Sequence, residues 1–341
     1  MDGSVRRIDY AYDTQGNPYL VTSYDAASGG SIVNQDERLF NGLAQLTAEY
    51  QSTSGAVDTS TTPVVQYVYT EMAGGVNNSR LTSITYPSGY EVDYNYASGL
   101  DDSISRLSSI SDSDGTLESY TYLGLETVVE RIHPETGINL TYISQTSSTG
   151  DAGDKYVGLD RFGRVVDQNW YDTGTSSSVD ENRYGYNRDS NRTYCENLSN
   201  SVFSEVYTYD PLGQLASFER GTLNNTKDGI TGTPSVSQTW GLDAIGNWTS
   251  LTTNGTTVIR TANQLNQYTA IGSATPTYDA NGNMTTDETG QQYVYDAWNR
   301  LVEVKNSSCT PVASYSFDGL GRRITETHGD TTTALYFSAA G

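Results

Sequence analysis

Carboxylates are numerous among the groups in this sequence that could do chemistry. The chain of 341 residues carries 41 Asp and Glu side chains, and some stand close together, as in Asp101–Asp102 and Asp112–Ser113–Asp114. A glycosidase uses two carboxylates about 5 to 9 Å apart across a cleft, and sequence spacing alone does not show such a cleft. Because Asp114–Gly115 is also a common turn dipeptide, we predict turns here and keep a polysaccharide-acting enzyme as a distant alternative.

Other catalytic and ligand-binding patterns are absent or incomplete. The histidines His133 and His328 lie beside polar residues, and no serine stands in the Gly-x-Ser-x-Gly setting of a nucleophile elbow. The segment Asp279–Asn283 resembles the start of a calcium loop, but the later spacing and the closing Glu do not fit. Cys195 and Cys309 fit neither a zinc site nor a redox pair, and their pairing stays open. We predict no catalytic residue, no cofactor and no metal site.

One aspartate-containing phrase recurs along the chain: an aromatic residue or Leu, then Asp, two variable residues, Gly and a polar residue. Asp at the first position of a turn hydrogen-bonds the backbone two residues on, and Gly or Asn three residues later supplies the left-handed conformation that follows a type I turn. An active site is rarely copied several times in one domain, whereas a turn is. We therefore predict bulged hairpin turns at Asp13 and Gly16, Asp160 and Gly163, Asp210 and Gly213, Asp243 and Gly246, Asp279 and Gly282, Asp296 and Asn299, and Asp318 and Gly321.

Aromatic doublets precede many of these turns or stand in similar stretches. They are Tyr10/Tyr12, Tyr67/Tyr69, Tyr94/Tyr96, Tyr120/Tyr122, Tyr184/Tyr186, Tyr207/Tyr209, Tyr293/Tyr295 and Tyr315/Phe317. Residues i and i+2 of a strand share a face, so each doublet puts two rings on one side of a sheet. Such rings either pack between strands, at roughly 0.5–1 kcal/mol per pair, or stack on a sugar. The candidates for stacking on a ligand are Tyr207, Tyr209, Tyr293 and Tyr295.

The elements that must carry these turns are short strands. The turn aspartates Asp279, Asp296 and Asp318 lie 17 and 22 residues apart, which fits two strands and two turns. We predict an all-β fold of consecutive antiparallel hairpins in one region, 1–341, with the most regular repeats in 278–341. Residues 22–63 are expected to form an irregular strand–turn segment, and residues 221–238 a long loop or insertion. A capped amphipathic helix of a dozen residues is nowhere indicated.

Composition supports a folded and hydrated β-protein. Only 35% of the residues are hydrophobic and 18% are charged, but 27 are Tyr, and disordered chains lack aromatic residues. The net charge of −22 repels phosphate backbones, so we expect no nucleic-acid partner. No apolar run approaches the roughly 18 residues of a membrane-spanning helix. We expect no membrane span, and any targeting signal to lie outside this chain.

The repeated phrase resembles the YD-repeat, or RHS-repeat, family. The stretch from Tyr278 to Thr327 carries the closest match, with YDANGN, YDAWNR and FDGLGR, and weaker copies extend it over nearly the whole chain. The resemblance implies a large secreted or cell-surface protein, mostly bacterial, with relatives among animal teneurins. It implies a long β-sheet that spirals into a hollow shell around a C-terminal toxin domain. We therefore expect a curved or spiralling sheet that forms part of such a shell, in an extracellular or cell-surface setting.

The resemblance also implies a self-cleaving block that uses aspartates around a DPxG-type signature. We expect this chain to lack that signature and the toxin domain, so autoproteolysis and toxicity are not carried over. The expected partners are other segments of a larger RHS-type polypeptide or its cargo, and unpaired strand edges permit self-association. The first hypothesis is a structural module that encloses or presents a polypeptide or mediates cell contact. The alternative is a glycan-binding module that uses rows of tyrosines.

Overall fold

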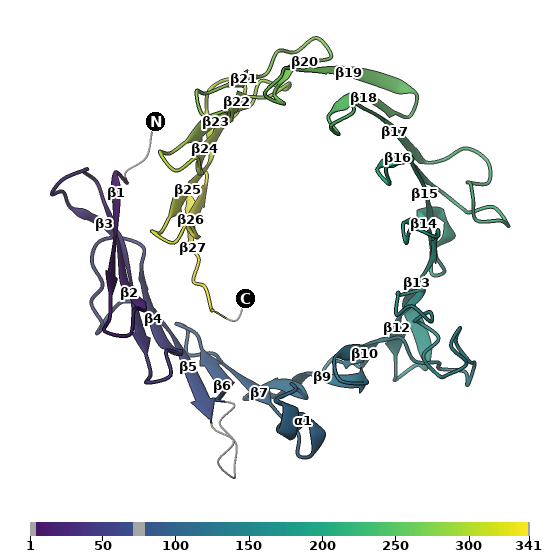
Figure 1. The fold of residues 1–341 in the computed structure, drawn as a ribbon, viewed down its shortest axis with the longest axis horizontal. Helices are drawn as coiled ribbons and strands as arrows, with labels where there is room; N and C mark the ends of the chain where they lie inside the picture. Colours follow the sequence, from purple (N-terminus) through teal and green to yellow (C-terminus); the bar gives the residue numbers. More distant parts are fainter. Residues whose placement is uncertain (1–4, 71–78, 340–341) are drawn as a thin grey trace. The chain divides into compact units, whose positions relative to one another are not determined.

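A computed structural model describes residues 5–70 and 79–339. Nearly all of its regular structure is β: among the described residues, helix is confined to α1 (Leu100–Ile104) and a 3-10 turn, η2 (Ser201–Phe203). Figure 1 traces the strands in chain order. The predicted fold class, all-β with consecutive antiparallel hairpins, is confirmed. No helix in the described part is both long enough and apolar enough to cross a membrane.

The chain divides into two compact units. The first unit joins the two ends of the sequence, Met1–Tyr94 and Ser273–Gly341, and the second is the continuous middle, Asn95–Gly272. The first unit therefore depends on contacts between residues that are far apart in the sequence.

Two sheets make up the first unit. The N-terminal sheet contains β1 (Arg7–Tyr12), β2 (Pro18–Tyr24), β3 (Ile32–Phe40), β4 (Leu46–Ser52), β5 (Val64–Thr70), β6 (Arg80–Thr85) and β7 (Glu91–Asn95). The C-terminal sheet contains β21 (Thr277–Tyr278), β22 (Met284–Thr286), β23 (Gln292–Tyr295), β24 (Leu301–Lys305), β25 (Pro311–Phe317), β26 (Arg323–His328) and β27 (Thr331–Ala334). In both sheets each strand pairs antiparallel with the next strand of the chain.

The second unit repeats the same connectivity. Its strands are β8 (Ser109–Asp112), β9 (Gly115–Leu123), β10 (Thr127–Ile132), β11 (Ile138–Thr141), β12 (Asp167–Asp172), β13 (Ser177–Tyr186), β14 (Arg192–Asn197), β15 (Glu205–Tyr209), β16 (Leu215–Arg220), β17 (Val236–Leu242), β18 (Trp248–Thr253), β19 (Thr256–Ala262) and β20 (Tyr268–Ile271). Each pairs antiparallel with its successor. Residues 221–235 form the loop between β16 and β17, and an isolated bridge joins Leu223 to Ile230 within it.

A shift of register marks the end of many hairpins. Ala11 pairs with Leu20, but the next residue, Tyr12, pairs with Pro18, so β2 contributes one more residue than β1. The same shift stands before the turn aspartates Asp210, Asp243, Asp279, Asp296 and Asp318. A bulge of this kind places one extra residue in the turn and increases the local twist of the hairpin.

The apolar core is small. In the first unit Val65, Tyr67 and Ile84 form a buried cluster on β5 and β6, with half-buried tyrosines and leucines around it. Many of the other buried residues on β2, β3 and β4 are polar, namely Thr22, Ser23, Asn34, Gln35, Asp36, Glu49 and Gln51. Burial of polar groups is costly unless they are hydrogen-bonded, so this face requires a polar partner.

Candidate functional site

The turn aspartates share one geometry. In the turn from Asp279 to Asn283, Oδ1 of Asp279 accepts hydrogen bonds from the amides of Asn281 and Asn283, each at 2.9 Å. The amide of Gly282 donates to the carbonyl of Asp279 at 3.1 Å, and the φ angle of Gly282 is +89°. The same two amide bonds and a positive φ three residues later occur in the turns that begin at Asp13, Asp160, Asp210, Asp243, Asp296 and Asp318.

A further member of the motif stands four residues after the aspartate. Oδ2 of Asp279 accepts a hydrogen bond from the side chain of Asn283 at 2.9 Å. The equivalent donors in other turns are Asn17, Arg164, Asn247, Arg300 and Arg322. The sequence phrase marks this position only as polar; the recurrence of Asn and Arg was the signal that could have revealed it.

These hydrogen bonds stabilise the charged form of the turn carboxylates. The bond from Asn283, together with backbone amides, holds the pKa of Asp279 below its ordinary value, and Asn17 and Asn247 do the same for the pKa of Asp13 and Asp243. A general acid or base works best when its pKa lies near the operating pH. These aspartates are therefore tuned away from proton transfer at neutral pH.

More copies of the turn exist than the sequence phrase indicates. Asn replaces Asp at Asn41, Asn187, Asn263 and Asn306, and each amide oxygen accepts the same two backbone hydrogen bonds. An Asp version begins at Asp287. The positive-φ residues of these five turns are Ala44, Ser190, Asn266, Cys309 and Gly290. These copies are hidden in the sequence because Asn stands for Asp in four of them, and Ala, Ser, Asn or Cys stands for Gly.

The C-terminal sheet contacts the polar face of the N-terminal sheet through the turn between β25 and β26. Arg322 is central to this contact. Its Nε donates to Oδ2 of Asp318 at 2.6 Å, within the same turn. One Nη donates to Glu49 at 3.1 Å and the other to Asp36 at 3.2 Å, across the contact. Arg38 adds a second guanidinium, with its Nε 2.8 Å from Glu49.

Neutral side chains of the N-terminal sheet complete the contact by binding backbone groups. The Tyr10 hydroxyl donates to the carbonyl of Gly319 at 2.8 Å, and the Asn34 amide donates to the carbonyl of Phe317 at 2.9 Å. Gln51 exchanges two hydrogen bonds with the backbone of Phe337, at 2.8 and 3.0 Å. We call the set Tyr10, Asn34, Asp36, Arg38, Glu49, Gln51, Asp318 and Arg322 the polar interface.

The charges of the polar interface do not cancel. Asp36, Glu49 and Asp318 are each 1% exposed, and two guanidiniums face these three carboxylates. Burial raises the pKa of Asp36 to about 7, and repulsion from Asp318 and Glu49 adds to this effect against the attraction of Arg322 and Arg38. Burial alone would lower the pKa of Arg322, but the carboxylates of Asp318 and Glu49 raise it above its ordinary value. Protonation of Asp36 would leave the cluster neutral.

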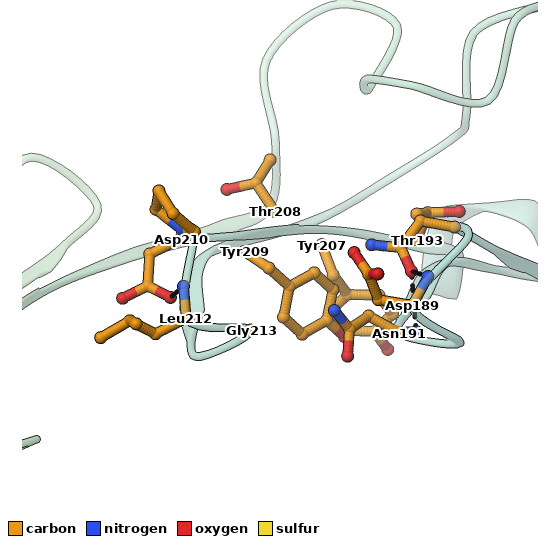
Figure 2. Close-up of a pocket in the computed structure, with 11 residues that line it drawn as sticks. Asp189, Asn191, Thr193, Tyr207, Thr208, Tyr209, Asp210, Leu212 and Gly213 are labelled. Atoms are coloured by element: carbon orange, nitrogen blue, oxygen red, sulfur yellow. Dashed lines mark hydrogen bonds between the residues drawn. The ribbon is translucent and has the colours of Figure 1, made fainter.

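A separate open pocket lies in the second unit. Its volume is about 770 Å³, and it lies between the turn that begins at Asn187 and the turn that begins at Asp210. Figure 2 shows Asp189 and Asn191 on one side of the Tyr209 ring and Asp210 on the other. The Tyr209 hydroxyl donates to the carbonyl of Arg192 at 2.8 Å. The pocket thus combines aromatic rings with carboxylate and amide groups.

The structure brings two of the stacking candidates into this pocket and places the other two elsewhere. Tyr207 and Tyr209 line it from β15. The Tyr207 hydroxyl donates to Glu205, and burial is the main cause that raises its pKa. On β23, the Tyr293 hydroxyl donates to Asp287 at 2.7 Å, which raises the pKa of Tyr293 to about 12, and Tyr295 is half-buried.

The remaining chemical candidates are engaged in local structure. His133 contacts the carbonyl of Ile138 through Nδ1 at 2.9 Å, and His328 lies edge-on to Tyr315, with ring centroids 6.4 Å apart. Asp112 accepts the amides of its own turn. Cys195 and Cys309 are both free thiols. Within the described ranges, no group of His, Cys, Asp and Glu is arranged to hold a metal ion.

One sequence expectation is wrong. The segment Asp210–Pro211–Leu212–Gly213 spells the DPxG pattern that we expected the chain to lack. In the structure, Oδ1 of Asp210 accepts the amides of Leu212 and Gln214, each at 2.9 Å, as in the other turns. The pattern at this position therefore coincides with an ordinary copy of the repeat turn.

Comparison with known proteins supports the fold. No family model matches the chain. A stretch of 101 residues, 28% of this chain, is 36% identical to the tRNA3(Ser)-specific nuclease WapA of Bacillus spizizenii and corresponds to 4% of that protein. The crystal structure of TcdB2-TccC3 without its hypervariable C-terminal region matches 94% of this chain and 18% of its own, with a TM-score of 0.64 and 14% identity.

A second solved structure gives the same result. The Photorhabdus luminescens Tc holotoxin pore matches 91% of this chain and 15% of its own, with a TM-score of 0.58 and 16% identity. This chain thus spans less than a fifth of the solved chains it matches. The similarity to these structures confirms the resemblance seen in the sequence at the level of the fold.

Proposed function

We propose that this chain is a non-enzymatic wall segment of a longer, secreted or cell-surface bacterial polypeptide. In this proposal the segment encloses or presents another stretch of polypeptide, or mediates contact between cells. The observation that carries it is the match to TcdB2-TccC3, which covers 94% of this chain but only 18% of the larger protein. A segment that takes up a small part of a larger shell needs neighbours to complete its task.

The local chemistry fits the role of a wall. Many hairpins are closed by a turn whose first side chain accepts hydrogen bonds from backbone amides of the same turn, so these turns need no thick apolar core behind them. The pKa values of Asp13, Asp243 and Asp279 lie below the ordinary value, and these three aspartates lie in separate hairpins. A wall of this kind is stable while both of its faces remain polar, which suits a surface that contacts an unfolded chain without binding it tightly.

The direct test is deletion of this segment from the parent polypeptide. With residues 1–341 present, we expect the enclosed stretch of the parent polypeptide to resist a protease at concentrations that digest an unfolded control. Without them, we expect that stretch to be cleaved at the rate of the control. Equal protection in both proteins contradicts the proposal.

A second function is favoured by the pocket around Tyr207 and Tyr209. Flat aromatic faces beside carboxylate and amide groups suit a sugar ring, and the cavity of about 770 Å³ has the size range of a small-ligand site. We propose glycan binding there as the alternative. On a glycan array, Tyr209→Ala should abolish a signal that Tyr209→Phe retains, because the ring stacks and the hydroxyl is already bonded to Arg192. Equal signals from the two variants would exclude stacking on Tyr209.

A further inference from the structure

The turn at the polar interface differs in sequence from the other copies. Between Asp318 and Arg322 it reads Asp-Gly-x-Gly-Arg, with Gly319 directly after the aspartate. The corresponding residues of the other copies are Thr14, Arg161, Pro211, Ala244, Ala280 and Ala297. Gly319 and Arg322 occur together in this turn alone among the Asp-headed turns of the phrase.

Gly319 is needed for space. A methyl group on its Cα would lie 2.5 Å from Cγ1 of Val21 and 3.0 Å from Cγ2 of Ile8. Val21 is 1% exposed, so it has little room to move. Gly321, by contrast, is needed for its backbone, because its φ is +83° and nothing lies within 4 Å of the methyl position. The first glycine lets the turn approach β1 and β2, and the second forms the turn itself.

Arg322 is needed because its planar guanidinium presents several N–H donors at once. One side chain bonds Asp318, Glu49 and Asp36 from three different nitrogen atoms. Asn at this position, as in the turn at Asn283, satisfies its own aspartate but is too short to reach the N-terminal sheet. Lys carries the charge but presents it as a single point, without the planar fork of guanidinium.

Two hydrogen bonds to backbone carbonyls help to hold the turn in place, and they do not depend on which side chains the turn carries. The carbonyls of Phe317 and Gly319 accept the side chains of Asn34 and Tyr10. Any hairpin that came close enough could make these two bonds. Which turn docks on the N-terminal sheet therefore depends on two features of the turn: the absence of a side chain at its second position and the guanidinium at its fifth.

We propose that the face formed by β1 to β4 is a binding site for a peptide turn of the form Asp-Gly-x-Gly-Arg. In this chain, the turn from Asp318 to Arg322 occupies the site in cis. The site rejects the turns that carry a side chain at the second position or Asn or Gln at the fifth. The site thereby determines which hairpin of the chain docks on the N-terminal hairpins. This selective binding goes beyond the wall function proposed above.

A buried thiol reports on the docked state. Ser23 is 0% exposed, and its Oγ lies 3.5 Å from the methyl position of Gly319. In the full chain carrying Ser23→Cys and Cys309→Ser, alkylation by iodoacetamide is followed peptide by peptide by mass spectrometry. The native Cys195 in the second unit serves as the internal reference.

The test variant is Gly319→Ala with Arg322→Asn, which gives the turn the second and fifth residues of the copy at Asp279. We expect alkylation at position 23 to accelerate at least tenfold while Cys195 keeps its rate. The matched control is Arg164→Asn, because Arg164 makes the same bond to its turn aspartate, Asp160, in the second unit. The control should leave position 23 protected.

Three results would overturn the proposal. Continued protection of position 23 in the double variant would show that docking does not depend on Gly319 and Arg322. Equal acceleration at Cys195 would show global unfolding rather than release of one turn. Protection that depends on protein concentration would show that a second copy, and not the same chain, supplies the turn. The single change Arg322→Lys, which should also expose position 23, tests the fork separately from the charge.

Discussion

The pKa of aspartate is shifted in opposite directions in two parts of this molecule. In the exposed turns at Asp13, Asp243 and Asp279, side-chain and amide donors surround the carboxylate and lower its pKa. At the polar interface, burial and two neighbouring carboxylates raise the pKa of Asp36 to about 7. The number of donors around each group and its distance from water decide the outcome. In both settings the carboxylate accepts hydrogen bonds from neighbouring protein groups, although Asp210 also lines the open pocket of the second unit.

The raised pKa of Asp36 predicts a pH dependence of stability. A carboxyl whose pKa is higher in the folded state stabilises folding when protonated, so its contribution is complete below pH 4 and is lost as pH rises through 7. The groups facing it are Glu49 on β4, Asp318 and Arg322 on the docked turn, and Arg38 on its own strand.

We expect the free energy of unfolding of the first unit to fall by on the order of 2–4 kcal/mol between pH 4 and pH 7.5. Urea titrations at a series of pH values, followed by Trp298 fluorescence with the other tryptophans replaced, would measure it. The variant Asp36→Asn should flatten this part of the profile. A rise in stability over the same interval for the unmodified chain would contradict the assignment.

The turn glycines predict a simple substitution series. Gly282 has a φ of +89°, where a β-branched residue is strained. We expect Gly282→Val to lower stability by about 1–3 kcal/mol. Gly282→Asn should cost much less, because Asn299 occupies the equivalent position with a φ of +60°. Circular dichroism melts that rank the two variants equally would show that the turn assignment is wrong.

At the scale of the element, the unit of construction is a hairpin closed by its own side chain. Asn41, Asn187, Asn263 and Asn306 head turns with the same amide bonds as the aspartates. The turn therefore needs a side-chain oxygen at its first position and does not need a charge there. A catalytic role would require the charge or the proton.

Because Asp and Asn are equivalent at the first turn position, we can predict the relative melting temperatures of three proteins: the unmodified chain, Asp243→Asn and Asp243→Ala. Asp243→Asn should melt within a degree or two of the unmodified chain at pH 7, and Asp243→Ala should melt clearly lower, because Ala leaves the amides of Ile245 and Asn247 without their acceptor. Below pH 4 the unmodified chain should lose stability that the Asn variant keeps, because the pKa of Asp243 is lowered in the fold. If Asp243→Asn melts at the same low temperature as Asp243→Ala, the side-chain oxygen does not stabilise the turn.

Much of the hairpin pattern could be predicted from the sequence, and the polar interface could not. Tyrosine doublets and Asp-x-x-Gly phrases are local signals, and they predict strands and turns directly. Asp36 lies in a continuous polar run, 34–38, on β3, and Glu49 lies at a polar position of the alternating strand β4, and both patterns normally indicate contact with solvent. Their burial depends on Arg322, more than 270 residues away, and nothing local to β3 or β4 indicates that partner.

At the scale of the whole molecule, we propose that this chain is one part of a larger wall. The net charge of −22 favours a hydrated surface, and the chain spans less than a fifth of the solved chains that it matches. The first unit contains both ends of the described chain, and the polar interface fastens one of its sheets to the other.

The most direct test is an electron cryomicroscopy map of the parent polypeptide. If the chain is a wall segment, residues 5–70 and 79–339 should form part of a continuous wall of hairpins, with density for another stretch of the polypeptide on the enclosed side. A map in which these residues form a free-standing module, with no polypeptide enclosed and the turn aspartates gathered around a bound substrate, would contradict it.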